Sequence, residues 1–234
     1  MTYAERVERA RRFLASIEKN HSPTALASSF GAEDMVVLDL IARDGLAIGI
    51  FTLDTGRLPR ETHELMAKVR DRYGIGIDVY SPWPDSVQAY VEEHGIDGFY
   101  DGVDQRVACC NVRKVEPLRR ALAGKRGWIT GLRREQAASR AAAGEVEHDA
   151  VNGKWKFSPL VEWTSDDVWR YLHENRVPYN ALHDRGYPSI GCEPCTRAVK
   201  PGEHPRAGRW WWEQDAAGKE CGLHAIPVRV VETA

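Results

Sequence analysis

No part of the 234-residue sequence contains the run of about 20 apolar residues that a membrane-spanning helix requires. The first twenty residues carry Arg and Glu throughout, so they do not match the uninterrupted apolar segment of a secretory signal. The formal net charge is only -2, which lacks the broad basic excess typical of proteins that bind duplex nucleic acid. These absences predict a cytoplasmic protein whose partners include neither a membrane nor nucleic acid.

Cysteine is scarce, and its distribution is uneven. The sequence has five cysteines: Cys109 and Cys110 are adjacent, Cys192 and Cys195 have C-x-x-C spacing, and Cys221 stands alone near the end. Structural disulfides are uncommon in the cytoplasm, so the two pairs indicate metal binding or thiol chemistry more than covalent cross-links. Buried thiols without a role are the alternative, which scattered cysteines would favour.

The two cysteine pairs together suit an all-cysteine zinc site or an iron–sulfur cluster. Two neighbouring thiolates on one tetrahedral zinc would strain the peptide between Cys109 and Cys110, whereas a cubane offers them separate irons. We therefore expect a [4Fe-4S] cluster held by Cys109, Cys110, Cys192 and Cys195. A redox dithiol is the alternative, but "GCEPC" lacks the strand-to-helix entry of thioredoxin-like motifs.

Apolar patterning alternates between helices and strands along most of the chain. Helices are expected over 1–20, 35–45, 59–73, 86–95, 106–124, 133–144 and from Thr164 onward, and strands over 24–29, 47–54, 75–81 and 127–131. Strands separated by helices predict a single α/β domain over 1–234, with a parallel twisted sheet covered by helices on both faces. Residues 200–234 are expected to form a mobile C-terminal arm within it, docked by the tryptophans at 210–212.

Three polar segments follow strands of this sheet. They are "SSFGAED" (28–34), "LDTGR" (53–57) and "GLRREQ" (131–136). Parallel sheets bind ligands beyond the carboxyl ends of their strands, so hydroxyls, backbone N–H groups and guanidinium groups should surround one crevice there. Residues 106–140 also contain ten Arg or Lys against two acids, which predicts an anionic ligand, although solvated helix faces explain some of these charges.

Cys221 remains outside the expected cluster. Arg206, Arg209 and Lys219 occur in the same segment, and positive charge lowers the pKa of a thiol and favours the nucleophilic thiolate. The pattern indicates a role in covalent catalysis. A surface thiol without function is the alternative.

The chain resembles the assimilatory adenylyl-sulfate reductases of the iron–sulfur type, relatives of the phosphoadenylyl-sulfate reductases. The resemblance spans residues 24–224 and rests on seven segments in the same order: "SSFGAED", "LDTGR", "CCNVRKVEPL", "GLRREQ", "GCEPCTR", "RAGRWWW" and "KECGLH". Each segment alone is weak to moderate, but the cysteine pairs combined with "ECGLH" are highly specific. The resemblance implies the adenine nucleotide alpha-hydrolase fold, in agreement with the expected parallel sheet.

The resemblance also implies an activity. Adenosine 5'-phosphosulfate would be reduced to sulfite and AMP, with thioredoxin or a related dithiol protein as the electron donor. Cys221 would attack the sulfur and form an S-sulfocysteine, which a donor thiol then resolves. The cluster would orient Lys114 and tune the local field rather than pass electrons. The oligomeric state stays open, a homo-oligomer included.

Site residues follow from the same resemblance, residue by residue. Ser28, Ser29 and Gly31 would contact the phosphate region, and Leu53, Asp54, Thr55, Gly56 and Gly131 would line the ribose and adenine. Lys114, Arg140, Arg206 and Arg209 would hold the phosphate and sulfate.

The sequence departs from the family pattern after "GLRREQ". Ala137 and Ala138 stand where many relatives have a hydroxyl residue, so a substrate contact from that hydroxyl is in doubt. A reductase for the 3'-phosphorylated substrate is the nearest alternative, although such relatives generally lack the four cysteines. A tRNA-thiolating enzyme and a redox sensor are further alternatives. The first should show an S-G-G-x-D-S loop, which is absent, and the second leaves Cys221 without a role.

Overall fold

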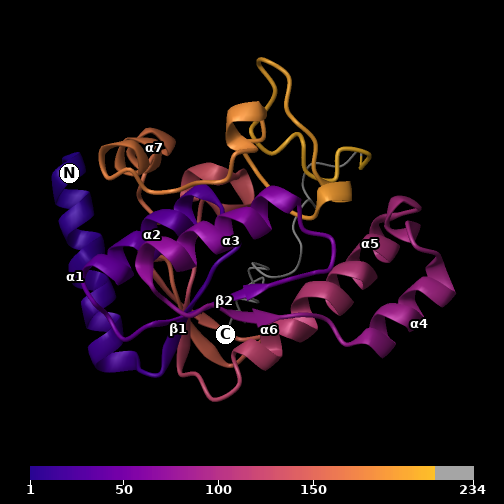
Figure 1. The fold of residues 1–234 in the computed structure, drawn as a ribbon, viewed down its shortest axis with the longest axis horizontal. Helices are drawn as coiled ribbons and strands as arrows, with labels where there is room; N and C mark the ends of the chain where they lie inside the picture. The colour runs from indigo at the N-terminus through magenta and orange to yellow at the C-terminus, as the bar shows by residue number, and fades with distance from the viewer. Residues whose placement is uncertain (214–234) are drawn as a thin grey trace, which may run out of the picture.

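The structure is a computed structural model, and it describes residues 1–213. Its centre is one six-stranded sheet in the order β3-β2-β1-β4-β6-β5 (Figure 1). The strands are β1 (Thr24–Ala27), β2 (Gly49–Leu53), β3 (Asp78–Tyr80), β4 (Gly127–Ile129), β5 (Val146–Asp149) and β6 (Lys154–Phe157). All neighbours pair in parallel except β5 and β6. The expected mostly parallel α/β sheet is confirmed.

Helices cover both faces of this sheet. They are α1 (Tyr3–His21), α2 (Ala32–Arg43), α3 (Arg60–Tyr73), α4 (Pro84–His94), α5 (Val103–Cys110), α6 (Glu116–Ala121) and α7 (Ser165–Glu174). Leu26 of β1 packs into the core formed with α1, α2, α3 and α7, whereas its neighbour Ala25 packs with Leu118 of α6. Successive side chains of a strand point to opposite faces, so one strand contributes to both cores. Figure 1 shows α2 and α3 on one side of the strands and α6 on the other.

The segment expected to be one helix over 106–124 consists of three connected helical pieces. A π-helix, η2 (Asn111–Val115), links α5 to α6. Pro117 lies in the first turn of α6, where its missing N–H and its ring are tolerated only because the wider turn precedes it. The irregularity predicted at Pro117 is therefore a π turn that carries Lys114.

The helix expected over 133–144 is wrong. That segment forms two short 3-10 turns, η3 (Arg134–Gln136) and η4 (Ala138–Arg140). Side-chain hydrogen bonds replace a continuous helix: Gln136 Oε1 accepts from the Arg133 backbone N–H at 3.1 Å and from Arg140 Nη1 at 2.5 Å. Tertiary contacts also hold the segment: the Arg134 N–H donates to the Val161 carbonyl at 3.1 Å, and Arg133 Nη2 lies 2.8 Å from Glu33 Oε1. These contacts override the helix propensity of an alanine-rich sequence. The β5–β6 hairpin was not expected either, because its strands are short and partly exposed.

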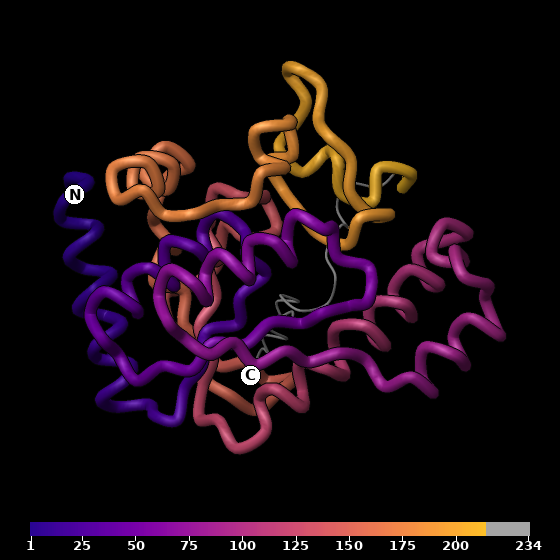
Figure 2. Tube along the Cα trace, viewed as in Figure 1, coloured from indigo at the N-terminus to yellow at the C-terminus, as the bar shows by residue number. Residues whose placement is uncertain are grey.

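The segment that follows α7 crosses towards α5 (Figure 2). Trp210 is buried, and its N–H donates to the Cys195 carbonyl at 3.1 Å. Trp212 packs against Tyr100 with ring centroids 4.5 Å apart, whereas Trp211 is exposed. Of the three tryptophans expected to dock the arm, Trp210 and Trp212 make buried contacts. Residues 214–234 lie outside the described part, and none of the helices within residues 1–213 is both long and apolar enough to cross a bilayer.

A buried carboxylate ties three helices together. Asp39 of α2 is fully buried and accepts hydrogen bonds from Tyr73 Oη at 2.7 Å and Tyr171 Oη at 2.8 Å, and Arg43 Nε lies 2.8 Å from its carboxylate. A hydrogen bond to a charged group contributes about 1.5–3 kcal/mol. We expect Tyr171→Phe to lower the free energy of unfolding by that amount, measured by urea denaturation.

Tyr179→Phe is the matched control, because Tyr179 donates to the exposed Asp184 at 3.1 Å. Its loss should stay below about 1 kcal/mol, as for most solvent-exposed hydrogen bonds. Equal losses in the free energy of unfolding would show that the buried hydrogen bond to Asp39 stabilises the protein no more than an exposed one.

Candidate functional site

A cavity of about 760 Å³ opens at the carboxyl ends of β1, β2 and β4. Most of the residues expected to bind substrate line it: Ser28, Ser29, Gly31, Leu53, Thr55, Lys114, Gly131, Arg140, Arg206 and Arg209. Asp54 and Gly56 do not. Asp54 Oδ1 accepts from the Gly56 N–H at 2.9 Å, and Gly56 has φ +68°. This pair therefore stabilises the turn that follows β2 and does not line the cavity. The three polar segments therefore meet at one edge of the sheet.

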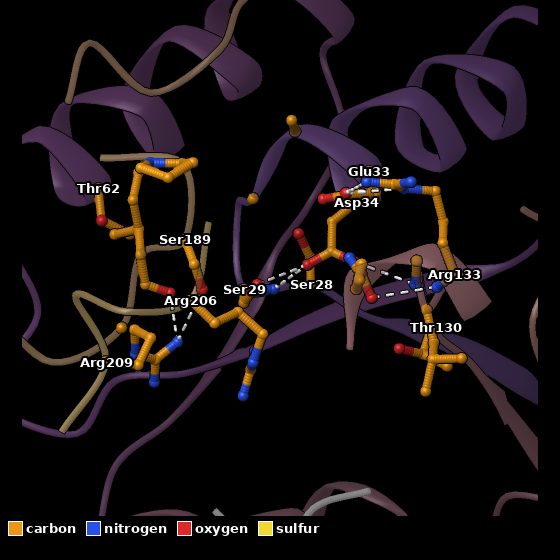
Figure 3. A pocket seen from close by; sticks show the side chains of 18 of the residues that line it. Ser28, Ser29, Glu33, Asp34, Thr62, Thr130, Arg133, Ser189, Arg206 and Arg209 are labelled. Carbon is orange, nitrogen blue, oxygen red and sulfur yellow. Dashed lines mark hydrogen bonds and ion pairs between the residues drawn. The ribbon is translucent and has the colours of Figure 1, made fainter. Parts of the chain in front are cut away.

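Asp34 holds two of these segments together. Its Oδ2 accepts from the Ser29 backbone N–H at 2.6 Å and from Ser29 Oγ at 2.7 Å, and its Oδ1 accepts from the Gly131 N–H at 3.1 Å (Figure 3). Gly131 approaches so closely that an added Cβ would lie 2.6 Å from Asp34 Oδ1 and 2.8 Å from Glu33 Cβ. Only glycine fits there without displacing the start of α2.

Burial raises the pKa of Asp34 to about 6, although the hydrogen bonds from Ser29 and Gly131 act in the opposite direction. The folded-state pKa thus lies above the ordinary value, so the folded protein binds a proton on Asp34 more readily than the unfolded chain. At neutral pH the group is a carboxylate that accepts from three donors. Below pH 6 it gains a proton and loses acceptor capacity.

Arg133 lines the cavity beside Glu33 of α2. Its guanidinium is buried, with Nη2 2.8 Å from Glu33 Oε1 and Nη1 2.8 Å from Glu135 Oε2. Figure 3 shows Arg133 and Glu33 on one side of the cavity, and Arg206 and Arg209 on the other. Two carboxylates therefore already match the charge of Arg133.

Four cationic residues from separate parts of the chain face this cavity. Lys114 comes from η2, Arg140 from η4, and Arg206 and Arg209 from the segment after α7. Arg209 Nη1 donates to the Ile190 carbonyl at 3.2 Å, and its guanidinium carbon lies 4.7 Å from the Trp210 ring centroid. A Cβ on Gly191 would lie 2.6 Å from that carbon, so this glycine allows the guanidinium to pack against the backbone. The site carries the positive charge expected for phosphate-like groups.

The four paired cysteines line a second, small cavity next to the first. Cys109, Cys110 and Cys192 are buried, Cys195 is partly buried, and all four are free thiols. Burial raises the pKa of Cys195 to about 12 and also raises the pKa of Cys109. Burial therefore favours the protonated thiol at Cys109 and Cys195. Within residues 1–213, no group of three or more His, Cys, Asp or Glu side chains is arranged to hold a metal ion.

The two cavities share a wall. Lys114, Cys192 and Trp210 line both of them. Thr55, which belongs to the loop after β2, has its Oγ1 3.2 Å from Cys192 Sγ. A charge in the cysteine cavity would therefore act directly on the groups of the larger one.

Some lining residues are not predicted by the sequence motifs. Glu33, Asp34 and Arg133 lie within the segments 28–34 and 131–136, but their local sequence does not indicate what they contact. His183 also lines the cavity, and burial lowers the pKa of its ring, which favours the neutral form. Cys221, expected to be the nucleophile, lies outside the described residues.

Comparisons with known proteins place the chain in a family. The model of the phosphoadenosine phosphosulfate reductase domain matches residues 23–198. Proteins named adenosine 5'-phosphosulfate reductase are similar throughout: that of Allochromatium vinosum is 52% identical over 95% of this chain and 87% of its own, and that of Burkholderia cepacia is 53% identical over 96% and 90%.

Solved structures agree with this. The phosphoadenylyl-sulfate reductase of Candida auris, in a phosphate complex, has a TM-score of 0.70 and 28% identity over 81% of this chain and 90% of its own. A yeast FAD synthetase, at 15% identity and a TM-score of 0.59, covers 84% of this chain and 67% of its own and shares the fold alone. The chain belongs to the phosphoadenosine phosphosulfate reductase domain family.

Proposed function

We propose that this chain reduces adenosine 5'-phosphosulfate to sulfite and AMP in sulfate assimilation. The observation that carries the proposal is the shared wall: a nucleotide-sized cavity with four cationic residues adjoins a cavity lined by four thiols. Relatives of about half-identical sequence that bear the name adenosine 5'-phosphosulfate reductase support the choice of substrate.

The nucleotide would be bound by the three segments at the sheet edge. Leu53, Thr55 and Gly131 would line the adenine and ribose, and the hydroxyls of Ser28 and Ser29 would face the phosphate. The N-terminus of α2, which begins after Gly31, adds backbone N–H groups and the positive end of its dipole. Asp34 keeps the Ser29 and Gly131 backbones in register and so fixes the width of this site.

The cationic residues would counter the repulsion between an anionic nucleophile and an anionic substrate. Lys114, Arg140, Arg206 and Arg209 all line the cavity, so the phosphate and sulfate oxygens would be held by guanidinium and ammonium donors. Such fixed charges act most strongly on the charge that moves to the leaving group in the transition state.

Cys221 is the proposed nucleophile. Its thiolate forms a bond to the sulfate sulfur, the S–O bond to the phosphate breaks, and the electron pair leaves with AMP. A thiolate of thioredoxin or a related dithiol protein then attacks the Cys221 sulfur and releases sulfite with the electron pair of the S–S bond. The second donor thiol resolves the mixed disulfide, which regenerates the Cys221 thiol and leaves the donor oxidised. A cytoplasmic location suits this chemistry because a reducing compartment keeps the cysteines as thiols.

The cysteine cavity fits a [4Fe-4S] cluster in its donor set. Four thiols from two segments line it, and Arg57, Arg106, Arg113 and Lys114 line the same cavity, which suits a cluster that is anionic with its thiolate ligands. Deprotonation of the raised-pKa thiols would accompany binding. When bound, the cluster would supply a fixed negative charge beside Lys114 without taking part in the electron transfer described above.

Intact mass of the protein tests the covalent step. Anaerobically purified protein mixed with adenosine 5'-phosphosulfate, without any thiol donor, should gain the mass of one sulfonate group. Cys221→Ser should gain none, because serine at neutral pH supplies no thiolate-like nucleophile. The 3'-phosphorylated substrate should give much less adduct.

An adduct formed mainly from the 3'-phosphorylated substrate would transfer the assignment to the phosphoadenylyl-sulfate reductases. No adduct from either substrate, in protein with intact iron, would contradict the covalent mechanism and favour a redox sensor or a tRNA-thiolating enzyme.

Metal analysis tests the cofactor independently of activity. The anaerobic protein should contain about four iron atoms and four sulfides per chain and absorb broadly in the visible range. Cys192→Ser should lose most of both, because the cluster loses a ligand in the interior of the protein. A colourless protein that contains zinc would instead support the all-cysteine zinc site.

Gly131→Ala tests the nucleotide cavity. The new Cβ would meet Asp34 and Glu33, and overpacking of this kind costs about 1–3 kcal/mol. If the same cost falls on the bound state, affinity for AMP measured by calorimetry should fall about 5- to 150-fold. Gly76→Ala is the control, since a Cβ there meets nothing within 4 Å and φ is not in the left-handed region. Unchanged AMP affinity in Gly131→Ala would mean that the nucleotide binds elsewhere.

A further inference from the structure

A buried arginine joins the cysteine cavity to the segment that leads to Cys221. Arg106 lies on α5, one turn before Cys110, and its side chain is 2% exposed. Its Nε donates to Glu213 Oε1 at 2.7 Å and its Nη2 to Glu213 Oε2 at 3.3 Å, so the pair is bidentate. A side-chain hydrogen bond also links Arg106 to Cys110.

The Arg106–Glu213 ion pair fixes the position of the chain at Glu213, because loss of either partner would leave the other charge buried and unpaired. The Glu213 side chain is 6% exposed, so separation of the pair would leave a charge in the interior without compensation. Two parallel hydrogen bonds also fix the relative orientation of the two groups, which a single contact would not. The chain at Glu213 is thus held against α5.

Trp210 links this fixed point to the nucleotide cavity. Its ring centroid lies 4.7 Å from the guanidinium carbon of Arg106 and 4.7 Å from that of Arg209. Trp210 has φ +43°, a left-handed conformation that bulky residues rarely adopt and keep only where the surroundings impose it. Arg106, Trp210 and Arg209 therefore form a continuous stack from the cysteine cavity to the substrate cations.

The short separation between Glu213 and Cys221 in the sequence relates the Arg106–Glu213 pair to the covalent step. Cys221 follows Glu213 by eight residues, and eight extended residues span at most about 28 Å. The place where the segment is held therefore limits where the Cys221 thiol can reach. A thiol tethered from the correct point reacts as an intramolecular group, whose rate depends strongly on geometry.

We propose that the Arg106–Glu213 pair is a positioning device for the covalent step: it holds the segment from Trp210 to Glu213, so that Arg209 and the chain leading to Cys221 start from fixed places beside the cavity. The proposal rests on the proposed function, because it assumes that Cys221 is the nucleophile. Arg106 and Glu213 are positioning residues, which touch neither the substrate nor the reacting sulfur.

Single-turnover kinetics of adduct formation test this proposal. Arg106→Lys, Glu213→Gln and the double variant are mixed anaerobically with saturating adenosine 5'-phosphosulfate, and the sulfonate adduct is followed by intact mass. Each single substitution should slow adduct formation about tenfold, and the double variant should be no slower than the slower single variant, because all three break the same pair. Affinity for adenosine, which carries no phosphate for Arg209 to contact, should stay within about twofold, since the segments that line the adenine and ribose are untouched.

Glu203→Gln is the matched control. Arg197 and Glu203 form a bidentate pair of similar geometry in the same segment, with distances of 2.8 Å and 3.1 Å, but both side chains are about one-third exposed. This variant should form the adduct at the wild-type rate. Circular dichroism should be unchanged in every variant, and iron content should be unchanged in Glu213→Gln and Glu203→Gln, whose side chains do not line the cysteine cavity, which separates positioning from folding.

Four results would overturn the proposal: adduct formation at full rate in Glu213→Gln, equal slowing in Glu203→Gln, losses that add in the double variant, or a loss of adenosine affinity together with rate. The last pattern indicates general damage to the cavity. A wild type that forms no adduct overturns the proposed function as well. The two failures are thus distinguishable by the behaviour of the wild type.

Discussion

The carboxylate of Asp34 is the interaction on which the nucleotide cavity depends. It joins the loop after β1 to the loop after β4 through the backbone N–H groups of Ser29 and Gly131. Burial of a carboxylate is costly and raises its pKa, and here three hydrogen-bond donors offset part of that cost. The same contact requires glycine at 131 and places the start of α2 against the floor of the cavity. One side chain therefore sets the spacing between two strands' binding loops.

The cysteine cavity depends on a different feature, the π turn between α5 and α6. The turn widens the helix after Cys109 and Cys110 and places Arg113 in the lining of the cysteine cavity and Lys114 at the wall shared with the nucleotide cavity. Arg113 Nη1 donates to the Thr55 carbonyl at 2.7 Å, so the π-helix is attached to the loop after β2. The two cavities are thus built from common elements rather than placed side by side by chance.

The sequence predicted the central sheet because hydrophobic periodicity and strand–helix alternation are local signals. It also identified the residues at the strand ends, since a parallel sheet brings those ends together whatever the details of packing. It missed what depends on contacts distant in the chain. The helix expected over 133–144 is absent because Arg133 pairs with Glu33 and the Arg134 N–H donates to the Val161 carbonyl, and the pairing of Arg106 with Glu213 likewise connects residues far apart in sequence. Asp34 was overlooked for the same reason: its role depends on Gly131, which local patterns do not reveal.

The antiparallel hairpin of β5 and β6 has a consequence for solubility. A sheet edge offers unpaired backbone groups to which a strand of another molecule can bind, and long, flat, apolar edges promote aggregation. Here one edge is β3, only three residues long, and the other is β5, which carries Glu147, His148 and Asp149 in succession. The apolar strands β1 and β4 lie inside, paired on both sides. The strands most able to recruit another chain are therefore those that no other chain can reach.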